Sequence, residues 1–168
     1  MKIGRAIVAG IVGGIVVIVA MIVVGVVAGT DADLCALAGA VITGREDAAA
    51  WVIGCASQMV VAVIAALVYA AVFEWIVRRA GAVVGVAIAL GHVVVAGIAV
   101  GFLPVSGMVN AGMLLPGAFL EYRGWPVIVT FVLAHLAFGA IVGARYGETL
   151  HRVASARAAW HDVTTESV

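Results

Sequence analysis

The chain has 168 residues, of which 65% are hydrophobic and only 11% are charged. Soluble domains are about 45–50% apolar and about 25% charged, so this composition excludes an ordinary soluble domain and indicates a membrane protein. The formal net charge is zero, and the Lys and Arg residues form no basic run, so the sequence carries no sign of nucleic-acid binding.

Four apolar segments are long enough to cross the hydrocarbon core of a bilayer, which needs about 20 helical residues. They predict an all-α membrane protein, a bundle of four transmembrane helices in a single domain over residues 1–147. We expect the four helices at residues 5–29, 48–79, 82–103 and 126–146.

The two ends of the chain differ in character. The apolar run that follows Lys2 and Arg5 is longer than the core of a cleaved signal sequence, so we expect it to be retained as the first helix. Residues 148–168 are polar and mixed in charge, and they predict a tail with a short interfacial helix near residues 150–160.

The segments between the helices are also apolar. Residues 34–43 are too short to span and predict an interfacial helix, with Asp33 as its N-cap. Residues 104–124 predict an apolar loop that lies against the bundle. Glu74 and Arg78 are spaced i,i+4 and predict an ion pair at the end of the second helix.

Basic residues are distributed unequally between the two ends of the predicted helices. Arg45 and Arg123 are the two that fall on one side, which leaves seven of the nine on the other. By the positive-inside rule, both termini lie in the cytoplasm and the protein lies in the bacterial inner membrane. The seven are Lys2, Arg5, Arg78, Arg79, Arg145, Arg152 and Arg157.

The second and fourth helices align without gaps, which suggests an internal repeat. Gln58 falls opposite His135, and Tyr69 falls opposite Tyr146, each eleven residues later. The repeated unit is a helical hairpin, so the two copies share one orientation. The alternative is that helices rich in Ala, Val and Gly align by chance.

His92 and His135 are the most informative polar residues, because each lies near the middle of its helix. Ionisable groups at this depth usually face the protein interior. One interpretation is a hydrogen-bonded pair that fixes helix register, together with Gln58. A second is axial ligation of one b-type haem, with small residues such as Gly139 and Gly143 leaving room for the macrocycle. A third is a proton or metal pathway.

Glycines recur in pairs four residues apart, a spacing that places both on one helix face and permits close helix crossing. We expect these pairs to pack helices of the bundle, or to dock a partner subunit or a second copy of the chain. The pairs are Gly10/Gly14, Gly25/Gly29, Gly81/Gly85, Gly97/Gly101 and Gly139/Gly143.

Cys35 and Cys55 form no C-x-x-C or zinc pattern. A disulfide is one possibility, and buried, unpaired thiols are the favoured one. The sequence contains no G-x-S-x-G, H-E-x-x-H or P-loop motif, which argues against an enzyme.

Several short motifs together resemble a group of bacterial four-helix membrane proteins of no known activity. They are the L-x-A-L-x-G of the first loop, the W-x-x-G that opens the second helix, the Y-A-x-x-F-E that ends it, and the H-L-x-F-G-x-x-x-G-x-x-Y-G that begins at His135. The resemblance covers most of residues 30–147 and implies a fold without an activity. In that group the second helix tends to carry a histidine at the position of Gln58.

The leading functional expectation is therefore a small non-enzymatic membrane protein without a cofactor, acting as an accessory or assembly subunit in the lipid bilayer. The alternatives are an electron carrier that holds one haem b through His92 and His135, and a small transporter or proton-conducting protein.

Overall fold

The computed structural model describes residues 1–103, 105–113 and 115–165, with side chains described for residues 1–103, 107–113 and 115–147. The regular structure of these residues is entirely helical. Four helices are long and apolar enough to cross a membrane, as predicted. They are α1 (Ile3–Ala28), α3 (Ala48–Ala71) with its continuation η1 (Val72–Val77), α4 (Ala82–Gly101) and the apolar part of α6 (Trp125–Thr165), which ends at Gly147.

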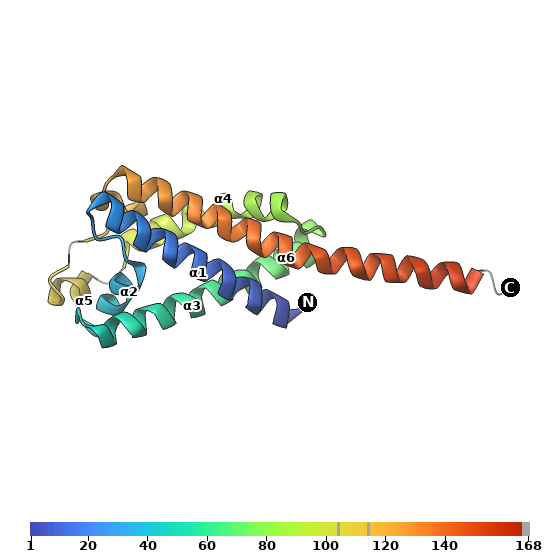
Figure 1. Ribbon diagram of the computed structural model, residues 1–168, viewed down its shortest axis with the longest axis horizontal. Helices are drawn as coiled ribbons and strands as arrows, with labels where there is room; N and C mark the ends of the chain where they lie inside the picture. The colour runs from blue at the N-terminus through green and yellow to red at the C-terminus, as the bar shows by residue number, and fades with distance from the viewer. Residues whose placement is uncertain (104, 114, 166–168) are drawn as a thin grey trace.

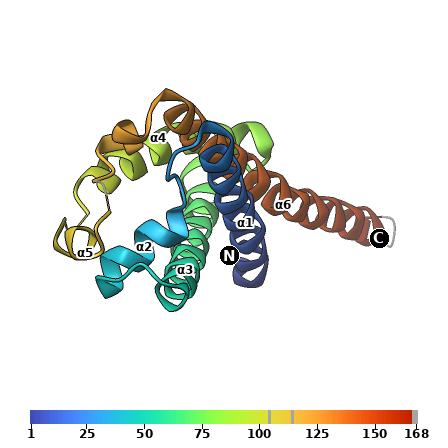
Figure 2. The same ribbon diagram turned by 60° about the vertical axis from the view of Figure 1, so that its left-hand side comes forward.

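The four long helices form an open arrangement rather than a closed ring. α1 and α6 pack along each other, α3 packs on the far side of α1, and α4 packs on the far side of α6. Figure 2 shows α3 and α4 at opposite ends of this row, with the short helices α2 (Leu34–Thr43) and α5 (Val105–Asn110) at one end of the bundle. α3 and α4 therefore have no extensive contact with each other.

Glycines bring α4 and α6 into close contact. A Cβ atom built on Gly85 of α4 would collide with the carbonyl oxygen of Gly139, and one built on Gly143 would collide with the carbonyl oxygen of Gly81. Gly10 of α1 lies similarly against α3, where an added Cβ would come 2.9 Å from the Cα of Val63. Two of the helix pairs thus depend on positions that only glycine can occupy.

The first connecting segment forms the predicted short helix α2. The carboxylate of Asp33 accepts hydrogen bonds from the backbone N–H groups of Cys35 and Ala36, which confirms the predicted N-cap. At the start of α3, Asp47 caps in the same way, and the Ala50 N–H holds the pKa of the Asp47 carboxyl below its usual range.

Cys35 and Cys55 are joined in a disulfide, so the favoured prediction of unpaired thiols is wrong. The sequence misleads here because the two residues appear at different depths, one in a connecting segment and one inside a helix. α2 folds back across α3 instead, and an added Cβ on Gly54 would collide with the Cys35 carbonyl oxygen. That close approach places the two Cα atoms 4.5 Å apart, within the range a disulfide can bridge.

The second connecting segment contains two short helices, α5 and the 3₁₀-helix η2 (Ala118–Arg123), where the sequence predicted a loop. It lies against the bundle, as expected, because Met108, Met113 and Leu120 are buried in the same core as Met21 of α1.

The predicted ion pair between Glu74 and Arg78 is wrong. The chain changes from α to π geometry at Val72, and Arg78 adopts a left-handed backbone with φ 54°. Since the spacing of four residues no longer places the two side chains together, Glu74 instead accepts a hydrogen bond from the hydroxyl of Tyr146 on α6.

The fourth long helix does not end at residue 146. α6 continues through Thr165, so the predicted separate interfacial helix is replaced by an extension of α6 that projects past the other helices (Figure 1). The side chains of Arg152 and Arg157 lie outside the described residues.

Replacing Gly85 with alanine tests the close contact between α4 and α6. The added methyl group meets backbone atoms of Gly139, which cannot move aside, so Gly85→Ala should lower the free energy of unfolding by about 1–3 kcal/mol, the usual cost of overpacking. Thermal unfolding in detergent measures this.

Gly91 of the same helix provides the control, because nothing lies within 4 Å of a Cβ atom at that position. Gly91→Ala should leave stability unchanged or raise it by up to about 1 kcal/mol through helix propensity. Equal effects of the two substitutions would contradict the packing described.

Candidate functional site

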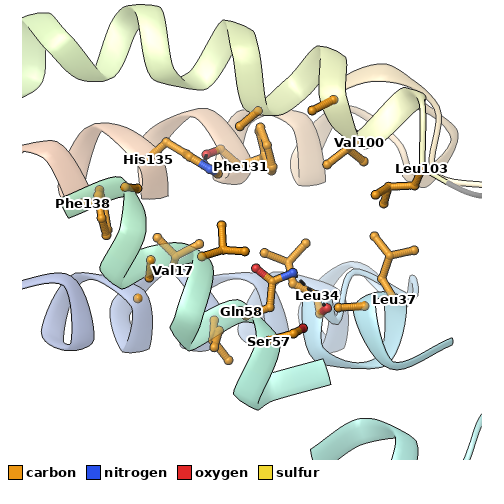
Figure 3. Close-up of a pocket in the computed structure, with 18 of the residues that line it drawn as sticks. Val17, Leu34, Leu37, Ser57, Gln58, Val100, Leu103, Phe131, His135 and Phe138 are labelled. Atoms are coloured by element: carbon orange, nitrogen blue, oxygen red, sulfur yellow. Dashed lines mark hydrogen bonds between the residues drawn. The ribbon is translucent and has the colours of Figure 1, made fainter. Parts of the chain in front are cut away.

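A cavity of about 460 Å³ lies inside the bundle, between α1 and α3 on one side and α4 and α6 on the other, with α2 at one end. This volume is in the range of small-molecule sites. The walls are almost entirely aliphatic, as Figure 3 shows. The apolar lining residues include Val17, Leu34, Leu37, Val61, Ala96, Val100 and Leu103.

The cavity opens at the surface between α3 and α4, on the side of the Tyr69–His92 contact where the two helices are apart. Val61 of α3 lines it and yet is 58% exposed, and Ala99 of α4 both lines it and is exposed. These two residues lie in helices that are long and apolar enough to cross a membrane. The opening therefore faces lipid if those helices span the bilayer.

Aromatic rings close the deep end of the cavity. His92 and His135 meet edge to face, with ring centroids 5.2 Å apart, and Phe138 lies 5.8 Å from His92. The hydroxyl of Tyr69 on α3 shares a hydrogen bond of 3.2 Å with Nδ1 of His92. The two predicted histidines are thus brought together, and Tyr69, which the site prediction did not include, joins them to α3.

The hydrogen bonding of His135 determines which of its ring nitrogens carries the proton. Its Nδ1 lies 2.8 Å from the carbonyl oxygen of Phe131. A carbonyl only accepts, so Nδ1 carries the proton, and in the neutral ring Nε2 is then an acceptor. His135 is 9% exposed, lines the cavity, and its Nε2 has no hydrogen-bonding partner among the described residues.

Gln58 lies across the cavity from His135 (Figure 3). Its amide nitrogen donates to the carbonyl oxygen of Leu34 at 3.5 Å, so the amide oxygen is on the side away from Leu34. Ser57, the neighbouring polar residue, donates its hydroxyl to the Gly54 carbonyl at 2.7 Å. The Gln58 oxygen and the His135 Nε2 are therefore two acceptors on residues that line the cavity.

The geometry of His92 and His135 does not fit axial ligation of one haem. Two axial rings must point at the iron from opposite faces of the macrocycle, whereas these rings contact each other edge to face. Of the small residues expected to leave room, Ala96 lines the cavity, but the three glycines do not. Gly139 and Gly143 lie against α4, and Gly97 lies against the ring of Phe119.

A second polar feature, Arg123 with Asp31, lies at the end of the bundle near α2. The Arg123 side chain is 4% exposed, and its Nη1 donates to the Asp31 carboxylate and to the Asp31 backbone oxygen, both at 2.6 Å. Sequence analysis placed Arg123 at this end but did not pair it with Asp31, because the two residues are 92 positions apart. The pair joins η2 to the end of α1.

The described residues contain no group of three or more His, Cys, Asp or Glu side chains that could hold a metal ion. The chain matches no protein-family model, no curated protein and no solved structure at a significant level. The resemblance to bacterial four-helix membrane proteins therefore stays a prediction, and the function has to be argued from the cavity.

An absorption spectrum tests the conclusion about haem. Protein produced with ample haem and purified in detergent should show no Soret band and no α and β bands on reduction, because the two rings leave no space for a porphyrin between them. Bands that disappear in both His92→Ala and His135→Ala would contradict the geometry described here.

Proposed function

We propose that this protein is a non-enzymatic integral membrane protein that binds a lipid-soluble molecule in the cavity between α3 and α4. The observation that supports this proposal is an apolar cavity of about 460 Å³, which contains few polar groups and is open at the exposed residues Val61 and Ala99. Sites of this kind, mostly apolar with a few placed polar atoms, are typical of small-molecule binding.

The route to the cavity supports a ligand taken from the bilayer rather than from water. Residues exposed on α3 and α4 beside the opening are apolar, among them Val61, Ile64 and Val95. A water-soluble ligand would have to cross this surface unsolvated, whereas a lipid-soluble one partitions there spontaneously.

The proposal includes both termini in the cytoplasm of a bacterial cell, with the disulfide at the outer face of the inner membrane. Two independent features support this orientation. Seven of nine basic residues favour the side of the termini, and the Cys35–Cys55 disulfide lies near the opposite ends of the helices, where an oxidising compartment would allow it to form.

The internal repeat stays part of the proposal in a limited form. Each half consists of a long helix, an apolar connection with short helices, and a second long helix packed on the first. The halves are not arranged symmetrically, because α1 packs along α6 while α3 and α4 have no extensive contact. This asymmetry produces the opening of the cavity.

The expectation of an accessory or assembly subunit has less support from the glycine pairs than the sequence suggested. Gly10 and Gly14 face α3, Gly97 and Gly101 face η2, and Gly139 faces α4. These glycines serve contacts within the chain. A partner subunit would therefore use other surfaces, and that role remains a proposal without a surface assigned to it.

A proton-conducting role is supported in part by the contact of His92, His135 and Tyr69. Beyond Tyr69 the described contacts run through Phe73, whose ring lies 6.1 Å from Tyr69 and 5.9 Å from Tyr146. Phenylalanine has no proton to transfer, so a ligand-binding role accounts for the site better than a proton path does.

Photolabelling in membranes tests the binding proposal. A tagged long-chain alkyl diazirine should label Leu37, which is buried and lines the cavity, and excess untagged compound should abolish that labelling. Labelling at Leu133, which is 59% exposed, should not saturate. Peptide mapping by mass spectrometry distinguishes the two positions.

Two matched variants of α4 complete the test. Ala96→Phe places a ring in the cavity and should reduce labelling of Leu37 several-fold, whereas Val94→Phe, at a 48% exposed position that does not line the cavity, should not. Unsaturable labelling of Leu37, or an equal response to both variants, would refute the binding site.

A further inference from the structure

The polar atoms of the cavity identify the chemistry of its ligand. We infer that the site takes a neutral, lipid-soluble phenol or hydroquinone, whose hydroxyl group donates to His135 and whose alkyl chain extends between α3 and α4 into the bilayer. This inference rests on the proposed binding function and specifies its ligand class.

The first step is the acceptor character of His135. Its Nδ1–H is used by the Phe131 carbonyl oxygen at 2.8 Å, and an imidazolium ion is costly within an apolar membrane interior. The neutral ring therefore offers Nε2 as a lone-pair acceptor. A ligand that donates a hydrogen bond to Nε2 therefore gains the free energy of that bond, and a ligand that can only accept does not.

The second acceptor is the amide oxygen of Gln58. The amide nitrogen donates one N–H to the Leu34 carbonyl oxygen, which leaves the second N–H as a donor and the amide oxygen as an acceptor. The hydroxyl of Ser57 is likewise directed to Gly54. The acceptors on His135 and Gln58 suit a hydroquinone, which has two hydroxyl donors, better than its oxidised quinone, which has no donor.

The third step is the preference for an aromatic head group. The ring of Phe131 lies 4.2 Å from that of His135, and Phe138 closes the same end of the cavity. Aromatic rings pack favourably edge to face or offset with other rings. A flat phenolic ring suits this end, while the aliphatic walls towards Leu103 suit an alkyl chain.

Competition against the photolabel tests the inference with stable probes. The compounds are 4-decylphenol, which donates a hydrogen bond, 4-decylanisole, which has the same shape but only accepts, and 4-decylcyclohexanol, which donates from a non-aromatic ring. With concentrations expressed per lipid, 4-decylphenol should compete about tenfold better than 4-decylanisole, the worth of one hydrogen bond to a buried acceptor. It should also exceed 4-decylcyclohexanol.

Variants assign the preference to His135. His135→Phe should bring phenol and anisole to equal competition, whereas Gln58→Leu should leave the phenol preference, because the single hydroxyl of 4-decylphenol donates to His135. Val94→Leu is the control, because Val94 is exposed and does not line the cavity, and it should leave the preference unchanged.

The outcomes separate the two proposals. If neither phenol nor anisole competes with the photolabel, both the binding function and its ligand class fail. If the two compete equally in the unaltered protein, or if the preference survives in His135→Phe, the cavity binds ligands but the assigned chemistry is wrong. If 4-decylcyclohexanol competes as well as 4-decylphenol, the preference for an aromatic head group is wrong, and the preference for a hydrogen-bond donor stands.

Discussion

The contact of α4 with α6 through Gly85, Gly139 and Gly143 is the constraint on which the rest of the structure depends. It brings the two backbones together, and so places His92 of α4 against His135 of α6 two turns along the same interface. α4 packs on α6 and α3 packs on α1, so no helix fills the space between α3 and α4. The cavity follows from this pairing.

Connections outside the long helices hold the cavity walls in place. α2 forms one end of the cavity and is fastened to α3 by the Cys35–Cys55 disulfide. The buried Arg123 joins η2 to Asp31 at the end of α1, and η2 fills the glycine face of α4 at Gly97. The end near α2 is thus covalently and electrostatically tied, while the side between α3 and α4 is open.

Much of the fold could be predicted from local sequence, because helix length, apolar runs and the Asp33 cap depend on neighbouring residues. The Cys35–Cys55 bond and the Arg123–Asp31 pair could not, since they depend on how α2 and η2 fold back. The π-helix before Arg78 could not be predicted either, because the apolar residues that form it do not distinguish π from α geometry. The two histidines could be recognised from the sequence because each lies near the middle of its helix. Their edge-to-face contact could not be predicted, because it depends on how α4 packs on α6.

A density map of the protein purified from its own membranes into lipid nanodiscs tests the central claim most directly. The account predicts separated α3 and α4 helices, with elongated density that enters between Val61 and Ala99 and ends beside His135. A bundle in which α3 and α4 pack together along their length, with no cavity between them, would contradict it.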